Sequence, residues 1–268
     1  MKEFWNNLIE SFTSKGVSET LAIVYIIVSM LLIVMAVVAL VMRIIVMIKY
    51  ADGNNTKTKS SKTSFEVARE ALNKAGLSHI QVKRSGFFRA TFFGNSYSLS
   101  QKTIYLRRGL ADKDSITAVS MALQKVAIAK MCEDGNGMTK TRNVMQILNV
   151  FAPIMFVPII LLGFLIDFIV FQTVGAFSIV GIVVGLFLIL TGLIATILSL
   201  PVEKKANTMA FNIIQKTGVL NEEEQQVAKK VFSAYMVAYI CEFIVAIIKA
   251  VQIVLEIVIN AQINKNSK

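Results

Sequence analysis

The longest apolar stretch of the chain, residues 147–200, constrains its fold more than any other feature. It contains 54 residues and a single charge, Asp167. A helix rises about 1.5 Å per residue and needs about 20 apolar residues to cross a bilayer, so this stretch is too long for one crossing and suits two. We therefore expect transmembrane helices over residues 147–172 and 174–200, joined by a tight turn near residues 172–178.

Two further stretches are long enough to cross a membrane. Residues 21–48 begin with an uncharged run, and we expect them to form a retained signal anchor rather than a cleaved signal peptide. Residues 231–259 carry three charges, so this stretch is the weaker candidate for a transmembrane helix of the two. A hydrophobic content of 55% also exceeds that of most soluble domains. The sequence thus predicts four transmembrane helices.

The positive charge of the chain is concentrated between the first two spans. Residues 49–146 contain 17 Lys and Arg against 7 acids, a net charge of +10, and residues 201–230 add five lysines. With four spans both segments lie on one side, which the positive-inside tendency makes cytoplasmic. We therefore expect a multi-pass cell-membrane protein with both termini outside, ending in a tail over residues 260–268. Residues 1–20 form an amphipathic segment at the outer interface.

Nucleic acid is not an expected partner of this basic chain. Membrane topology and anionic lipid explain the excess of +11, and no module that combines stacking aromatic residues with basic residues stands out.

A small domain of mixed structure is expected over residues 63–146, after a flexible linker over residues 49–62. A hydroxyl and a carboxylate three residues apart, Thr63 and Glu66, form a capping box that begins a helix. Short strands should follow, and the next helix should start near Ser115. The expected strands cover residues 80–82, 90–99 and 103–106, and the second helix covers residues 115–131 and is capped by Asp112 or Asp114. The fold class is therefore an α+β membrane protein with a small cytoplasmic domain.

Several segments of this domain and of the later part of the chain resemble one family. They resemble the membrane-bound neutral zinc metallopeptidases of the YugP type over roughly residues 20–259. The matching segments are Ser64 to Arg69 with Gly76 and Leu77, Lys102 to Leu106, Ser115 to Val119, Leu200 to Glu203, Gly218 to Glu224, and Ala228 to Val231. The resemblance implies a metallopeptidase-like fold for the domain.

The metal-binding motif of that family is absent from this chain. Members of the family carry HExxH, in which two His bind Zn²⁺ and the Glu activates water. The register of the resemblance places Gln124 and Ile128 at the two His positions and Lys125 at the Glu position. Glu203 is retained, and the resemblance implies that it would be the third zinc ligand. We therefore expect no catalytic residue, no bound metal and no cofactor.

Two questions about this position stay open in the sequence. Lys125 either replaces the charge of the metal beside Glu203 or lies solvated on an exposed helix face. The only histidine, His79, could form another zinc site with Cys132 and Glu203, although a surface or packing role is the simpler reading of His79, and an inert thiol that of Cys132.

The function expected from these features is that of a pseudopeptidase, an inactive membrane metallopeptidase homologue. Its expected partners are the lipid bilayer and a membrane protein or peptide segment that it holds or regulates without cutting. One alternative is an active zinc peptidase with an unrecognised metal site. Another is a transport or channel component that uses a charged stripe formed by Glu242, Lys249 and Glu256, with Asp167 as a further intramembrane charge. The oligomeric state is left open.

Overall fold

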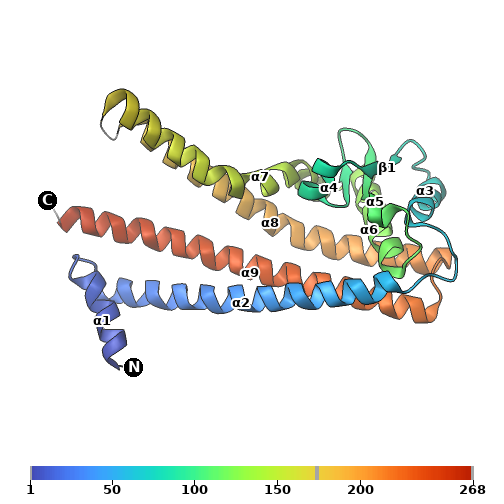
Figure 1. The fold of residues 1–268 in the computed structure, drawn as a ribbon, viewed down its shortest axis with the longest axis horizontal. Coiled ribbons are helices and arrows are strands. Elements are labelled where there is room, and N and C mark those ends of the chain that lie inside the picture. Colours follow the sequence, from blue (N-terminus) through green and yellow to red (C-terminus); the bar gives the residue numbers. More distant parts are fainter. Residues whose placement is uncertain (1, 173–174, 267–268) are drawn as a thin grey trace. The chain divides into compact units, whose positions relative to one another are not determined.

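The computed structural model describes residues 2–172 and 175–266, and most of them are helical (Figure 1). The expected turn residues 173–174 and the terminal residues 1 and 267–268 lie outside this range. The elements are α1 (Lys2–Thr13), α2 (Glu19–Asn55), α3 (Ser64–Lys74), β1 (Gln81–Ser85), α4 (Phe87–Phe93), β2 (Ser96–Ser98), β3 (Thr103–Arg107), α5 (Arg108–Ala111), α6 (Ile116–Glu133), α7 (Gly137–Ile166), the π-helical turn η1 (Asp167–Phe171), α8 (Ala176–Thr217) and α9 (Glu222–Asn266).

The chain forms two compact units, one of residues Met1–Arg43 and Ile240–Lys268 and the other of Ile44–Tyr239. The second unit contains the small sheet, but helices dominate it, so the expected α+β class is corrected to a mostly helical fold with a three-stranded mixed sheet. Its core also takes in residues of α8 and α9, including Ala206 and Phe232. The sheet and the helices around it are therefore built together with the long helices, because their apolar faces are buried against one another.

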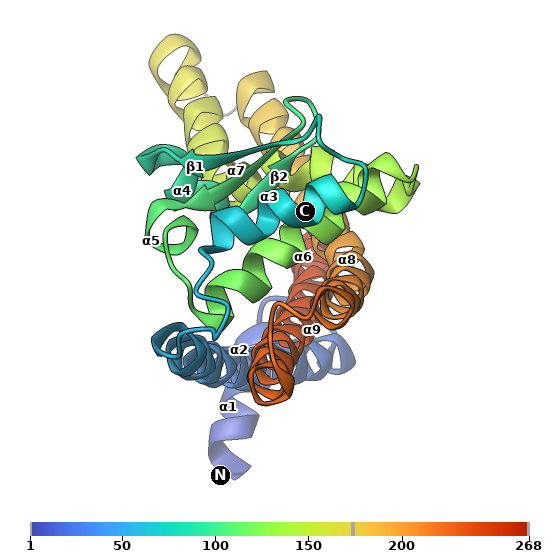
Figure 2. The ribbon, with the colours of Figure 1, turned by 90° about the vertical axis from the view of Figure 1, so that its right-hand side faces the viewer.

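The sheet has the order β1-β3-β2, with β1 parallel and β2 antiparallel to β3. Ile104 of β3 pairs with Val82 and Tyr97, and all three side chains are buried. Figure 2 shows α3 and α6 packed along this sheet. The expected strand over residues 90–99 is wrong in its first half, because residues up to Phe93 belong to α4.

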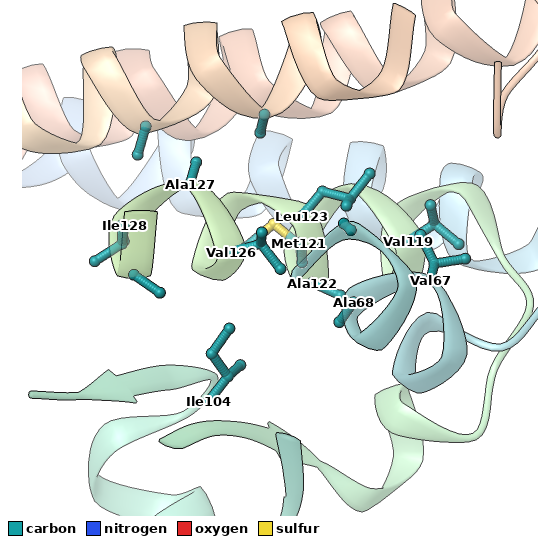
Figure 3. Packing of buried hydrophobic residues seen from close by; sticks show 14 of the residues in the cluster. Val67, Ala68, Ile104, Val119, Met121, Ala122, Leu123, Val126, Ala127 and Ile128 are labelled. Carbon is teal, nitrogen blue, oxygen red and sulfur yellow. The ribbon is translucent and has the colours of Figure 1, made fainter. Parts of the chain in front are cut away.

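Helix α6 is the centre of the second unit. All its residues except Lys130 and Glu133 are buried, including the polar ones. Figure 3 shows Ile104 of the sheet facing Val126 of α6, while Ala127 points toward the opposite layer of helices. The N-cap is Ser115, whose hydroxyl accepts from the Ala118 N–H, rather than either predicted aspartate. The helix is thus held between two layers, which orients its side chains firmly.

The capping box at the start of α3 is confirmed. The Thr63 hydroxyl accepts from the Glu66 N–H, and the Glu66 carboxylate accepts from the Thr63 N–H at 2.8 Å. The linker before it is shorter than expected, because α2 continues to Asn55.

Within the described residues, two helices are long and apolar enough to cross a membrane, α2 and α8, where four were expected. The apolar part of α7 and η1, Val157–Phe171, is shorter, and the apolar part of α9 is interrupted by Glu242, Lys249 and Glu256. Many large apolar side chains of α2 and α8 are exposed, among them Ile33 and Phe187. Exposed apolar surface of this extent is unusual for a soluble protein and suits contact with lipid.

Helices α7 and α8 lie side by side (Figure 1), and a glycine and one carboxylate fix their close approach. A Cβ at Gly163 would collide with the backbone carbonyl of Phe177, so only glycine permits this close approach. The buried Asp167 carboxylate accepts from the Gly175 and Ser178 N–H groups at 2.8 and 2.7 Å. It therefore caps the start of α8, which gives this lone charge a structural role.

Candidate functional site

The three positions at which the family motif is replaced lie on the buried helix α6. Gln124 and Ile128 are each 1% exposed and Lys125 is 7% exposed. Ile128 belongs to the apolar core cluster and has no polar atom to offer. The three side chains are therefore inside the protein, in an environment where any charge requires a partner.

Glu203 enters the same region from α8 and is fully buried. It follows the helix-internal Pro201 by two residues. One carboxylate oxygen, Oε2, accepts a hydrogen bond from Gln124 Nε2 at 2.9 Å. The structure thus brings together the Gln124 and Glu203 positions that the sequence analysis singled out.

The charge partner of Glu203 is Arg142 of α7, which the sequence analysis did not single out. The Arg142 Nη2 donates to Glu203 Oε1 in an ion pair whose side chains are 14% and 0% exposed. The neighbouring Asn143 fixes this part of α7 beside the sheet, since it donates to the Tyr97 carbonyl and accepts from the Leu99 N–H. This turn of α7 is therefore tied to α8 through Arg142 and to the segment around β2 through Asn143.

A second missed residue, Asn207, completes the polar cluster. Its Oδ1 accepts from Gln124 Nε2 at 2.6 Å, and it lies one turn after Glu203 on α8. Within the described residues, Gln124 Oε1 and Asn207 Nδ2 are buried without a hydrogen-bond partner. Asn207 follows Glu203 by four residues, which places both on one face of a helix, so the sequence could have indicated it. Arg142 becomes apparent only when α7 packs against α8.

The structure excludes one of the two sequence-based interpretations of Lys125. The residue is buried, so it is not solvated on an exposed face, and its charge acts on Glu203, although the direct ion pair of Glu203 is made by Arg142. Burial lowers the pKa of the Lys125 ammonium, which Glu203 partly opposes and Arg142 reinforces. Lys125 therefore acts on Glu203 through its field rather than through a direct contact.

Lys204 and Lys205, the two residues that follow Glu203 on α8, are exposed. The cations that surround Glu203 are therefore Arg142 and Lys125.

One comparison with known proteins identifies the family. The model of the family described as "Putative neutral zinc metallopeptidase" matches residues 27–258. The chain belongs to this family. The match confirms the resemblance drawn from the segments of its sequence, and no curated protein or solved structure matches the chain.

The residues of this metallopeptidase family member do not fit the zinc ion that the family name implies. Zinc in a peptidase takes His nitrogens and a carboxylate, and leaves one position for water. Here one oxygen of Glu203 accepts from a guanidinium and the other from an amide, and Ile128 offers no electron pair. Two cationic groups near this carboxylate would also repel a divalent ion.

The alternative ligand set is not assembled either. His79 Nε2 lies 3.5 Å from a Glu133 carboxylate oxygen, while Glu203 is paired with Arg142. Among residues 2–172 and 175–266, no group of three or more His, Cys, Asp or Glu could hold a metal ion. Burial raises the pKa of the Cys132 thiol to about 11, so the reactive thiolate is disfavoured at neutral pH.

The charged stripe of α9 contacts α2 within the first unit. Arg43 pairs with Glu242 at 3.0 Å, and the Tyr25 hydroxyl donates to Glu256 at 3.0 Å. Lys249 is exposed. Two of the three charges thus tie neighbouring helices together, which accounts for them without an ion pathway.

Proposed function

We propose that this protein is a catalytically inactive membrane metallopeptidase homologue that binds a membrane-protein partner or peptide segment without cutting it. The observation that carries the proposal is the Arg142–Glu203 ion pair. The Arg142 guanidinium and the Gln124 amide each bind one oxygen of Glu203, the acid retained from the metal site of the family. Both oxygens that could bind a metal ion are therefore already engaged. Since Gln124, Lys125 and Ile128 supply neither the His ligands nor the general base of a zinc peptidase, we assign this site a binding role.

The multi-pass topology is part of the proposal, and the pairing of the helices supports it. Asn143 of α7 and Glu203 of α8 are both fixed in the second unit. If the apolar part of α8 crosses a bilayer, α7 must cross back beside it. In the first unit α9 is tied to α2 by Glu242 and Glu256, so these two helices would cross as a second pair. Both termini then lie opposite the basic domain, which is cytoplasmic by the positive-inside tendency.

The experiment asks whether a partner is held and left intact. The full-length protein, carrying a photocrosslinking group at exposed positions of the second unit, is crosslinked in native membranes and incubated with Zn²⁺. We expect a crosslinked membrane polypeptide of unchanged length, in the same yield with and without a chelator. Shortening of that polypeptide that stops on chelation would instead indicate an active peptidase.

A further control addresses the transport alternative. Purified protein in liposomes is expected to give the same ion flux as empty liposomes, because Glu242 and Glu256 are engaged with α2 side chains. Flux that is lost on Lys249→Gln would contradict the binding role.

A further inference from the structure

A cavity of about 560 Å³ lies beside Lys125 in the second unit. Its wall is built by the last turns of α2, the turn before β2, the end of β3, and parts of α6 and α9. The residues that matter for its chemistry are Lys125, Arg107, Asn95, Tyr50, Tyr235 and Met121. The polar groups in this wall lie next to apolar side chains, as in a site for a molecule with a polar and an apolar part.

The charge of the cavity wall is entirely positive. Lys125 and Arg107 line it, and none of the lining residues is an acid. Arg107 donates its Nε to the Ala90 carbonyl at 3.1 Å, which holds the guanidinium at the cavity wall. Among the ion pairs of the described residues, none includes Lys125 or Arg107. Lys125 borders the cavity without a direct ion pair, and burial disfavours its charged form, so an anion bound in the cavity would stabilise the ammonium.

Neutral hydrogen-bond donors accompany these cations. The hydroxyls of Tyr50 and Tyr235 remain protonated at neutral pH, since the ordinary pKa of tyrosine is about 10. Asn95 is oriented by the Arg107 N–H, which donates to its side-chain oxygen at 2.8 Å. This set of amide, hydroxyl and cationic groups suits the oxygens of a phosphate.

The position of the cavity along α2 indicates where that phosphate comes from. The uncharged run of α2 ends before Arg43, and the cavity is lined by α2 residues from Val46 to Ala51. At about 1.5 Å per residue these lie roughly 5 to 12 Å beyond Arg43. A bilayer has a headgroup layer of about 5 to 8 Å on each side of its hydrocarbon core, so the cavity is at headgroup depth if α2 crosses.

We propose that this cavity binds the phosphate of an anionic phospholipid headgroup, with Lys125 and Arg107 supplying the positive charge. The inference rests on the membrane placement of α2 proposed above, but not on the absence of peptidase activity. The lysine that stands at the catalytic position of the family would then serve a second purpose, as a lipid ligand. The polar headgroup would contact the cations and tyrosines, and the acyl chains would leave along the apolar side of α2.

The test measures lipid binding by the full-length protein in a neutral detergent. Native mass spectrometry compares phosphatidylglycerol with phosphatidylcholine of the same acyl chains, for the wild type, Lys125→Met and Arg107→Gln. Lys204→Gln is the matched control, since it removes one exposed positive charge outside the cavity. We expect the wild type to prefer phosphatidylglycerol, and each cavity variant to lose about five- to tenfold in affinity while Lys204→Gln does not.

Several outcomes would overturn the proposal. Equal binding of the two lipids, or an equal loss in Lys204→Gln, would mean that no specific headgroup site exists. Displacement of phosphatidylglycerol by equimolar inorganic phosphate would assign the cavity to free phosphate. Displacement by a peptide with a free C-terminal carboxylate, but not by its amide, would assign it to a peptide. Extraction of the wild-type protein from membranes by alkaline carbonate would instead refute the membrane placement, and zinc content does not enter this assay.

Discussion

Replacing Arg142 with methionine is expected to lower the free energy of unfolding by about 3 to 5 kcal/mol. The change leaves the Glu203 carboxylate, which is fully buried, without its ion-pair partner. Lys125 lies close enough to act on this charge through its field but forms no ion pair with it. The loss is measured by denaturant unfolding of the purified protein in detergent micelles.

Two further variants separate this effect from a general loss of packing. Lys140→Met removes an exposed charge from the same helix and should change stability by less than about 0.5 kcal/mol. Adding Glu203→Gln to Arg142→Met removes the buried charge and should restore most of the lost stability. If Arg142→Met is as harmless as Lys140→Met, the ion pair is not what holds Glu203 in the core.

Replacing Lys125 with glutamate, the residue type of the family motif, is expected to cost a similar 3 to 5 kcal/mol at neutral pH. The new carboxylate would be buried near Glu203, and no metal would be present to neutralise the pair. Lys125→Gln has nearly the same shape without either charge and should lose less stability than the glutamate variant, since Arg142 still pairs with Glu203. The measurement is again the free energy of unfolding, at pH 7.5 and at lower pH.

The pH dependence of the glutamate variant has a definite sign. Burial and the nearby Glu203 would raise the pKa of the new carboxyl above the ordinary value of about 4.3. The folded state would then bind more protons than the unfolded state, so stability falls as pH rises through that window and recovers as pH drops toward 4.3. If Lys125→Glu were as stable as Lys125→Gln at pH 7.5, position 125 would not be a buried site that disfavours negative charge.

Much of the local structure was predictable because its signals are local. The capping box at Thr63 and Glu66, the strand over residues 103–106 and the apolar positions of α6 each depend on neighbours within a few residues. The segment from Ala90 to Phe93 misled prediction, because its aromatic residues favour a strand while its contacts allow a short helix.

The site itself was only half predictable. Its former motif positions and Glu203 follow from spacing within segments that resemble the family. Arg142 and Asn207 depend instead on how α6, α7 and α8 meet, and nothing in the sequence near them specifies a charge partner. The count of four spans rested on length and hydrophobicity alone, while the structure provides two helices of sufficient apolar length, with α9 interrupted by charges that contact α2.

The most direct test of the account is the zinc content of the purified protein, measured by inductively coupled plasma mass spectrometry after exposure to Zn²⁺ and removal of loosely bound metal. Peptide cleavage is followed on the same sample, with an active HExxH peptidase as control. We expect far less than one zinc per chain and no cleavage above background, because Arg142 and Gln124 engage the retained carboxylate. One tightly bound zinc per chain, with cleavage that a chelator abolishes, would contradict it.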